Sequence, residues 1–294
     1  MSRTGSTADL LTRAAELSGI DATDAVSIRN GSNAIYELRG GIVARIGKPG
    51  SYFAAERELR VSQWLNQSGI PTVEAVPSVP QPVVVDDRPV TWWHLIPEHR
   101  ASTPEELGAM LRALHSLPPP TSFELPTYDP FTGLEDRLVA SATLDESDRA
   151  WLIEHYATLV KQYSELPDPQ APCVIHGDAW QGNLIVPSSG VPTVLDLDKV
   201  SIGRRDWDLV QIAVDCVDFE RIGPVEYQSF VKAYGGYDLT DQLAFRAMAD
   251  IQELRWVGFA VDQSTTSEFA AREAKHRIDC LSGMILKPWR WSAL

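Results

Sequence analysis

The sequence predicts an α+β protein in which a small antiparallel sheet with one helix precedes a larger, mainly helical region. Residues 25–96 contain short apolar runs rich in β-branched residues and separated by turn residues, whereas later residues show apolar positions spaced three and four apart. The chain has 294 residues, 44% of them hydrophobic, which is enough for two lobes with their own cores. We therefore place a first lobe at residues 1–96 and a second at residues 97–294.

In the first lobe, the runs AVSIRN, NAIYELRG, GIVARIG, PVVVD and VTWWHLI predict the strands of an antiparallel sheet. Residues 53–66 predict a helix before Gly69 and Pro71 end the pattern. Its apolar residues near one face are Ala54, Ala55, Val61, Trp64 and Leu65. The side chains of Trp92 and Trp93 are expected to pack in the core.

The second lobe should begin with a helix, because Thr103 can cap it, Pro104 suits its first position and Glu106 completes a capping box. Further helices are predicted at 132–164, 206–216, 224–234, 240–260 and 267–283. Two short strand-like pieces, PCVIH and TVLDLD, lie between helices and are expected to pair as a hairpin.

The composition argues against a nucleic-acid partner, because the formal charge of −14 leaves no clustered Lys and Arg for a phosphate backbone. The beginning of the sequence lacks the pattern of a secretory signal, and no stretch is long and apolar enough to span a membrane. We therefore expect a cytoplasmic protein without a membrane partner. The odd and widely spaced Cys173, Cys216 and Cys280 predict neither disulfides nor a zinc site, and we expect all three to be buried.

The charge is unevenly distributed along the chain. Residues 101–294 hold 29 of the 40 acidic residues but only 16 of the 26 Lys and Arg. Such an acidic region could attract a cationic ligand, or it could serve solubility alone.

The candidate catalytic and metal-binding residues lie in the segment VIHGDAWQGNLIVPSSGVPTVLDLDKV. His176-Gly177-Asp178 is followed by Asn183, and the next strand ends in Asp196-Leu197-Asp198. A carboxylate base, an amide oxygen and a second carboxylate that converge on one point suit a metal-bound phosphate. The interpretation requires the side chains of Asp178, Asn183 and Asp196 to meet around one divalent cation.

This segment resembles the catalytic loop of the aminoglycoside phosphotransferase and choline kinase-like family. The loop of that family has His-Gly-Asp where protein kinases have His-Arg-Asp. The resemblance implies a two-lobed protein kinase-like fold that transfers phosphate from ATP, or GTP, to a small hydroxylated molecule with Mg²⁺. It also implies that Asp178 is the catalytic base and that Asn183 and Asp196 bind Mg²⁺, assisted by Asp198.

The same resemblance gives two further residues a structural role. His176 would brace the catalytic loop. Asp208, in RRDWDLV, would stand at the start of the following helix and accept hydrogen bonds from backbone N–H groups, which would steady that loop.

The first lobe departs from the family pattern at one position. Arg45 in GIVARIG stands where kinase-like enzymes place the Lys that reaches the phosphates, and Glu58 is its expected partner. Lys48 is the alternative if the register differs. Asn33, after Gly31, would contact the phosphates, and the adenine would pair with backbone groups around His94 to Ile96.

By the same resemblance, the acceptor would bind over the helical lobe, with Asp215, Asp218, Glu253 and Trp256 as candidates for contacts beside Arg255. A cationic aminoglycoside or amino sugar would suit these carboxylates, with a ring stacked on Trp256. The alternative is that these residues are surface acids and a core tryptophan.

Other functions remain open at this point. Arg45 is compatible with a pseudokinase that binds nucleotide without transfer, although a module without catalysis has no need for Asp178, Asn183 and Asp196 together. Asp196-Leu-Asp-Lys-Val also matches the DxDx[TV] pattern of a phosphatase with an Asp nucleophile, but too little chain follows it for the βαβ domain that this motif opens. Gly177 in place of Arg disfavours a protein kinase.

Overall fold

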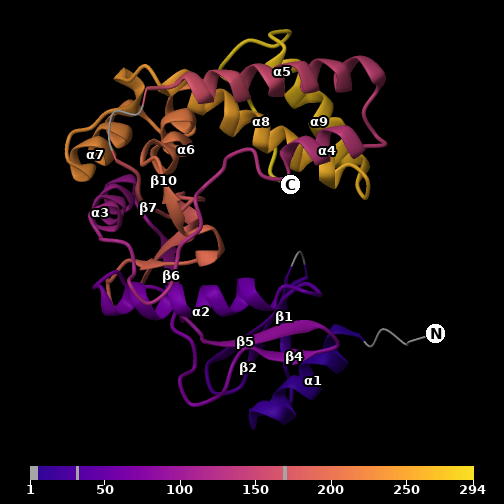
Figure 1. Ribbon diagram of the computed structural model, residues 1–294, viewed down its shortest axis with the longest axis vertical. Helices are drawn as coiled ribbons and strands as arrows, with labels where there is room; N and C mark the ends of the chain where they lie inside the picture. Colours follow the sequence, from indigo (N-terminus) through magenta and orange to yellow (C-terminus); the bar gives the residue numbers. More distant parts are fainter. Residues whose placement is uncertain (1–5, 31–32, 168–170) are drawn as a thin grey trace. The chain divides into compact units, whose positions relative to one another are not determined.

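The computed structural model describes residues 6–30, 33–167 and 171–294, and its ribbon is drawn in Figure 1. The chain divides into two compact units. Unit 1 comprises Met1–Ser102 with Gln181–Val200, and unit 2 comprises Thr103–Trp180 with Ser201–Leu294. Gly31, expected in the phosphate-covering loop, lies outside the described residues.

Unit 1 contains the antiparallel sheet that the sequence predicts. The strands follow the order β1-β2-β3-β5-β4, and every neighbouring pair is antiparallel. Their bounds are β1 Val26–Asn30, β2 Ala34–Leu38, β3 Ile42–Ile46, β4 Val83–Val85 and β5 Arg88–His94. Arg45 on the central strand β3 is opposite Thr91 on β5.

Two helices cover this sheet, one on each side (Figure 1). Helix α1, Thr7–Ser18, packs against β3 and β4, and its apolar face belongs to a core in which Ala44 and Trp92 are fully buried. Because side chains alternate along a strand, Arg45 projects from the opposite face, toward helix α2, Tyr52–Gln67. Helix α1 was not predicted, although Ser6 and Asp9 form a capping box that marks its start.

The expected hairpin between PCVIH and TVLDLD is wrong. TVLDLD supplies β9, Thr193–Val194, which pairs with β8, Leu184–Pro187, and β8 pairs in turn with β6, His99–Ala101. PCVIH supplies β7, Cys173–Ile175, which pairs with β10, Ser201–Gly203. The apolar run LIVP after Asn183 forms the strand β8, which lies between β7 and β9 in the sequence. The loop from β8 to β9 is shorter than the segment from β7 to β9, so β9 pairs with β8 rather than with β7. Residues 181–200 therefore group with unit 1.

Unit 2 is mainly helical, as predicted. Its helices are α3 Pro104–His115, α4 Leu134–Ala140, α5 Glu146–Glu165, α6 Asp206–Val217, α7 Pro224–Tyr234, α8 Phe245–Gln263 and α9 Glu268–Leu281. Thr103 caps α3 with the predicted capping box. The single helix expected at 132–164 is two helices, because Ser141 adopts an extended conformation and Asp145 caps a new start.

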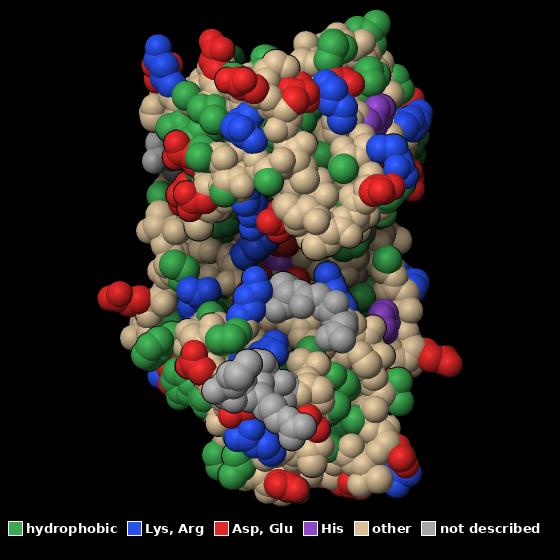
Figure 2. Space-filling view, turned by 90° about the vertical axis from the view of Figure 1, so that its right-hand side faces the viewer, with side chains coloured by type: hydrophobic (Ala, Val, Ile, Leu, Met, Phe, Trp, Pro, Cys, Tyr) green, Lys and Arg blue, Asp and Glu red, His purple; other side chains and the backbone are tan. Residues whose placement is uncertain are grey.

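Helix α8 forms the centre of unit 2 and packs against α4, α5, α6 and α9. Its buried residues lie on all sides, as expected of a helix surrounded by others. No helix among the described residues combines the length and apolar character needed to cross a membrane. Cys280 is buried as expected, but Cys173 and Cys216 are only partly buried. On the face in Figure 2, acidic and basic side chains lie interspersed.

Candidate active site

The loop that carries Asp178 follows β7 in unit 2. Gly177 has φ of +81°, a left-handed conformation that a residue with a side chain adopts only with strain, so Gly is required where protein kinases have Arg. The ring of His176 is almost completely buried, and its Nδ1 accepts a hydrogen bond of 3.3 Å from the N–H of Asp178. Asp178 itself remains partly exposed.

Asp208, in the first turn of α6, braces this loop. Its Oδ2 accepts a hydrogen bond of 2.6 Å from the N–H of His176, and its Oδ1 accepts one of 2.8 Å from the N–H of Gly177. His115 Nε2 lies 3.0 Å from Oδ2. Trp207 Nε1 donates to the carbonyl of Gly177. The side chain of Asp208 is fully buried, so these partners replace water around a charged group. This is the backbone bracing expected from the sequence.

The DLD segment belongs to unit 1. Asp196 has φ of +54°, a strained conformation for a non-glycine residue, and precedes the 3₁₀ turn η2, Leu197–Lys199. Its side chain is 44% exposed and lies 3.8 Å from Arg45 Nη2. Arg57 Nη2 donates to the carbonyl of Asp198, with a length of 2.8 Å. The segment is thus held by arginines while the Asp196 carboxylate remains accessible.

Asn183 ends a second 3₁₀ turn, η1, Gln181–Asn183, just before β8. Its carbonyl accepts a hydrogen bond of 2.9 Å from the N–H of Leu195, the residue before Asp196. This bond fixes the backbone of Asn183 next to the DLD segment. The structure therefore brings Asn183, Asp196 and Asp198 into one part of unit 1, while Asp178 and Asp208 come together in unit 2.

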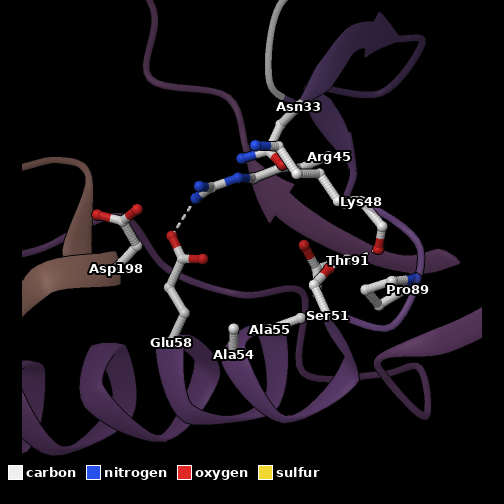
Figure 3. Close-up of a pocket in the computed structure, with 11 residues that line it drawn as sticks. Asn33, Arg45, Lys48, Ser51, Ala54, Ala55, Glu58, Pro89, Thr91 and Asp198 are labelled. Carbon is white, nitrogen blue, oxygen red and sulfur yellow. Dashed lines mark hydrogen bonds and ion pairs between the residues drawn. The ribbon is translucent and has the colours of Figure 1, made fainter. Parts of the chain in front are cut away.

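Arg45 and Glu58 form the ion pair expected from the sequence (Figure 3). Glu58, on α2, is 6% exposed. Burial raises the pKa of Glu58 to about 7; Arg45 opposes that change, whereas the charges of Asp198 and Asp196 add to it. A single arginine therefore does not fully offset the cost of burying this carboxylate.

The Arg45–Glu58 pair lines a pocket of about 220 Å³ within unit 1. Asn33, Lys48 and Asp198 lie around the same pocket (Figure 3). Lys48, only the alternative in the sequence analysis, is exposed and stands beside Arg45 there. Arg57 was missed altogether; the only sequence signal was its position next to Glu58.

His94 and Ile96 lie outside this pocket. His94 is exposed, and its backbone N–H donates to the carbonyl of Glu74, with a length of 2.8 Å. The N–H of Leu95 donates to the carbonyl of Gly41. Ile96 is partly exposed. Two of the backbone donors in the segment expected to meet adenine are therefore used within unit 1.

The predicted acceptor residues of unit 2 interact with cations of the chain. Asp218 is 2.8 Å from Arg246 Nη1 and 2.6 Å from Lys287 Nζ, and Glu253 is 2.9 Å from Arg246 Nη2. Both carboxylates are almost fully buried. Burial and a hydrogen bond shared with Asp218 raise the pKa of Glu253 well above its ordinary value. Burial alone would raise the pKa of Asp218, but hydrogen bonds from Glu253, Lys287 and Arg246 hold it below its ordinary value.

The other two acceptor candidates, Asp215 and Trp256, have fewer charged neighbours than Asp218 and Glu253. Asp215 forms an ion pair of 2.7 Å with Arg221, and burial raises the pKa of its carboxyl despite that arginine. Trp256 is partly buried and meets the rings of Phe219 and Trp291 edge to face.

The fold is similar to those of several solved structures. An amicoumacin kinase in complex with AMP-PNP, Ca²⁺ and Ami has a TM-score of 0.71 at 14% identity, over 95% of this chain and 93% of that chain. A spectinomycin phosphotransferase in complex with ADP and spectinomycin has a TM-score of 0.65 at 15% identity, over 94% and 97%. A choline/ethanolamine kinase family protein from Mesorhizobium loti has a TM-score of 0.63 at 16% identity, over 94% and 95%.

At these identities the structural similarities establish the kinase-like fold. No curated protein sequence is similar enough to count as a match. A sequence model of the phosphotransferase enzyme family, however, matches residues 27–247, which include the His-Gly-Asp loop, Asn183 and the DLD segment. The chain therefore belongs to the phosphotransferase enzyme family and is a small-molecule phosphotransferase with a kinase-like fold.

Proposed function

We propose that the protein transfers the terminal phosphoryl group of ATP, or of GTP, to a hydroxyl group of a small molecule with Mg²⁺. The observation that carries this proposal is the bracing of the loop before Asp178, whose two preceding backbone N–H groups are fixed by the buried carboxylate of Asp208. A loop held so firmly suits a base that must be oriented toward a bound hydroxyl group. We propose that the reaction takes place in the cytoplasm.

Asp178 is the proposed base. It is partly exposed, so its carboxylate can be reached by an acceptor, and the hydrogen bond from its own N–H to His176 Nδ1 fixes its backbone. In the proposed reaction the Asp178 carboxylate accepts the proton of the acceptor hydroxyl group. The oxygen of that hydroxyl group attacks the terminal phosphorus of the nucleotide. The released products are the phosphorylated acceptor and the nucleoside diphosphate.

Asn183, Asp196 and Asp198 fit a magnesium ion by their chemistry. Carboxylate and amide oxygens are the protein ligands that Mg²⁺ prefers, and it usually binds one or two carboxylates together with phosphates. The strained backbone of Asp196 and the accessibility of its side chain support a binding role. When bound, Mg²⁺ would neutralise the charge that develops on the phosphates.

Arg45, Lys48 and Asn33 are the proposed phosphate ligands. Arg45 and Lys48 bring two positive charges to one pocket of unit 1, and Asn33 adds an amide. Glu58 orients Arg45 in the way that a carboxylate orients the corresponding Lys in kinases. The guanidinium of Arg45 can bind two phosphate oxygens through a planar pair of parallel N–H donors, a geometry that the ammonium group of a Lys lacks. The backbone around His94 and Ile96 remains the proposed contact for the nucleotide base.

The acceptor is proposed to be a hydroxylated small molecule, with a cationic aminoglycoside or amino sugar tested first. The names of the amicoumacin kinase and the spectinomycin phosphotransferase support a test on antibiotics. Asp215 and Trp256 are the stronger candidates for acceptor contacts. Asp218 and Glu253 are buried and form ion pairs with the partly exposed Arg246 and Lys287, so a cationic acceptor would have to displace these cations to reach them.

The test is acceptor-dependent release of ADP. Purified protein is incubated with ATP and Mg²⁺ and a panel of aminoglycosides, amino sugars and amino alcohols, with parallel reactions in excess EDTA or with GTP. We expect ADP release that requires both one class of acceptor and Mg²⁺. Nucleotide binding without turnover on any acceptor would favour the pseudokinase. A covalent aspartyl phosphate formed without ATP would favour the phosphatase.

A further inference from the structure

A second pocket, of about 330 Å³, opens in unit 2 where the C-terminal ends of α3 and α7 lie side by side (Figure 1). None of its residues belongs to the proposed catalytic, magnesium, nucleotide or acceptor sets. The residues that line it are Arg112, His115, Ser116, Ala171, Cys173, Arg205, Tyr234, Gly235 and Tyr237.

Two arginines give this pocket its charge. Arg112 is exposed on the last turn of α3 and forms no ion pair within the described part of the chain. The guanidinium of Arg205 lies 4.0 Å from the centre of the Tyr237 ring, a cation–π contact that holds the group without removing its charge. Neither arginine forms an ion pair among the described residues, so two positive charges lie at one pocket in a chain of formal charge −14.

The remaining polar groups do not cancel that charge. Burial raises the pKa of the Cys173 thiol to about 11 and also raises the pKa of Tyr237, so both are neutral near pH 7. Asp206, the acid next to Arg205, is 3% exposed; it accepts a hydrogen bond of 2.9 Å from the Tyr237 hydroxyl and lies 3.5 Å from Arg204. Among the described residues, no carboxylate lines the pocket.

One wall of the pocket is also connected to the catalytic loop. His115 Nδ1 lies 2.8 Å from the Tyr234 hydroxyl, and His115 Nε2 lies 3.0 Å from Asp208 Oδ2. Asp208 in turn holds the backbone N–H groups of His176 and Gly177. A ligand in the pocket would therefore lie two hydrogen bonds from the loop that carries Asp178.

We propose that this pocket binds a phosphate group, either free or on a small organic molecule, with Arg112 and Arg205 as its charged ligands. The planar, forked donors of two guanidinium groups match the oxygens of a phosphate, and the volume admits a small metabolite but not a polymer. The binding does not rest on the proposed phosphotransfer, because it uses other residues.

The test is calorimetric titration of the full-length protein with inorganic phosphate, glucose 6-phosphate and, as the uncharged control, glucose. Saturating ADP is present so that the nucleotide site does not compete. We expect saturable binding of at least one phosphate compound and none of glucose. Binding of both phosphates would mean that the phosphate group suffices, and binding of glucose 6-phosphate alone would mean that the organic part contributes.

The arginines are tested one at a time. Arg112→Gln and Arg205→Gln should each weaken binding by about tenfold or more, since each removes a charge-assisted contact. Arg272→Gln, at an exposed position on α9, is the matched control and should bind like the wild type. If the Arg205 variant does not fold, Arg112→Glu at the exposed position should abolish binding. Wild-type affinity in Arg112→Gln or in a folded Arg205→Gln would overturn the site.

A second readout locates the ligand. Saturating phosphate should shift the ring nitrogen resonances of His115, which lines the pocket, in the wild type but not in Arg112→Gln. Unchanged His115 resonances at saturation would place the anion elsewhere and overturn the proposal. If the proposed phosphotransfer fails while these results hold, the anion site stands alone.

Discussion

Units 1 and 2 each contain a buried carboxylate among the candidate functional residues, and the two units hold it in different ways. Asp208 in unit 2 accepts hydrogen bonds from two backbone N–H groups and contacts His115. Glu58 in unit 1 is paired instead with a charged side chain, Arg45. Backbone donors are fixed by the fold, whereas a long side chain can change its partner when a charged ligand arrives.

This difference indicates that the two carboxylates have different roles. The Asp208 region is a fixed frame that orients a loop. In the Arg45–Glu58 region, Asp196 also lies 3.8 Å from the Arg45 guanidinium. Binding of nucleotide phosphates and Mg²⁺ can therefore change which partner Arg45 contacts. Substitutions in or beside the loop that carries Asp178 should therefore lower both stability and turnover. Substitutions in the pocket of unit 1 should mainly alter nucleotide affinity and the pH dependence of stability.

The largest effect should come from the residue that the frame orients. Asp178→Ala removes the proposed base, which is expected to lower kcat by about 10²–10⁴-fold while ATP–Mg²⁺ binding survives. Steady-state kinetics and nucleotide titration measure the two quantities. Asp262→Ala, on the exposed side of α8, is the matched control and should behave like the wild type. Wild-type turnover in Asp178→Ala would refute the assigned base.

Asp208→Ala should be the most destabilising of these changes. It leaves the N–H groups of His176 and Gly177 buried without their acceptor, and the free energy of unfolding is expected to fall by about 3–5 kcal/mol. Urea unfolding measures it. Asp208→Asn keeps one acceptor oxygen and should lose less. If the free energy of unfolding of Asp208→Ala falls by less than about 1 kcal/mol, the Asp208 carboxylate does not hold the loop in place.

Glu58 should make stability depend on pH. Its folded pKa of about 7 is higher than the ordinary value of 4.5, so the folded protein binds the proton more tightly than the unfolded chain. The free energy of unfolding should therefore fall as pH rises from about 4.5 to about 7 and level off above that, by at most about 3 kcal/mol.

Glu58→Gln isolates this contribution. The difference in unfolding free energy between the wild type and Glu58→Gln, measured without Mg²⁺ at pH 5 and pH 8, should shift in favour of the variant at the higher pH. A difference that is the same at both pH values would mean that Glu58 is ionised throughout, and that its pair with Arg45 is as fixed as the Asp208 frame.

The smallest effect should come from Arg45. Arg45→Ala removes a proposed phosphate ligand and is expected to raise KM for ATP by roughly 10–100-fold, with a smaller change in stability, because Glu58 can take up a proton instead. Arg45→Lys keeps the charge and should raise KM less than tenfold. An unchanged KM in Arg45→Ala would assign the phosphates to Lys48 and Asn33.

Short-range patterns identified much of the fold. The capping box at Thr103, the apolar runs of the sheet and the helix at 224–234 are encoded within a few residues, so the sequence alone predicts them. The partners of β7 and β9 were mispredicted, because strand pairing depends on which chain segments meet in space and an intervening strand, β8, was not recognised. The charged pairing of Arg45 with Glu58 followed from the family pattern.

By itself, the sequence determined the order of elements and the residue types at the catalytic loop, since both depend on local periodicity and on a motif of a few positions. Only the tertiary structure decided the pairing of the buried Asp218 with Lys287, 69 residues apart, and the neighbourhood of Arg112 and Arg205. Burial and pairing of charges depend on contacts between distant segments, and the free energy of a charge is set by its three-dimensional surroundings rather than by its neighbours along the chain.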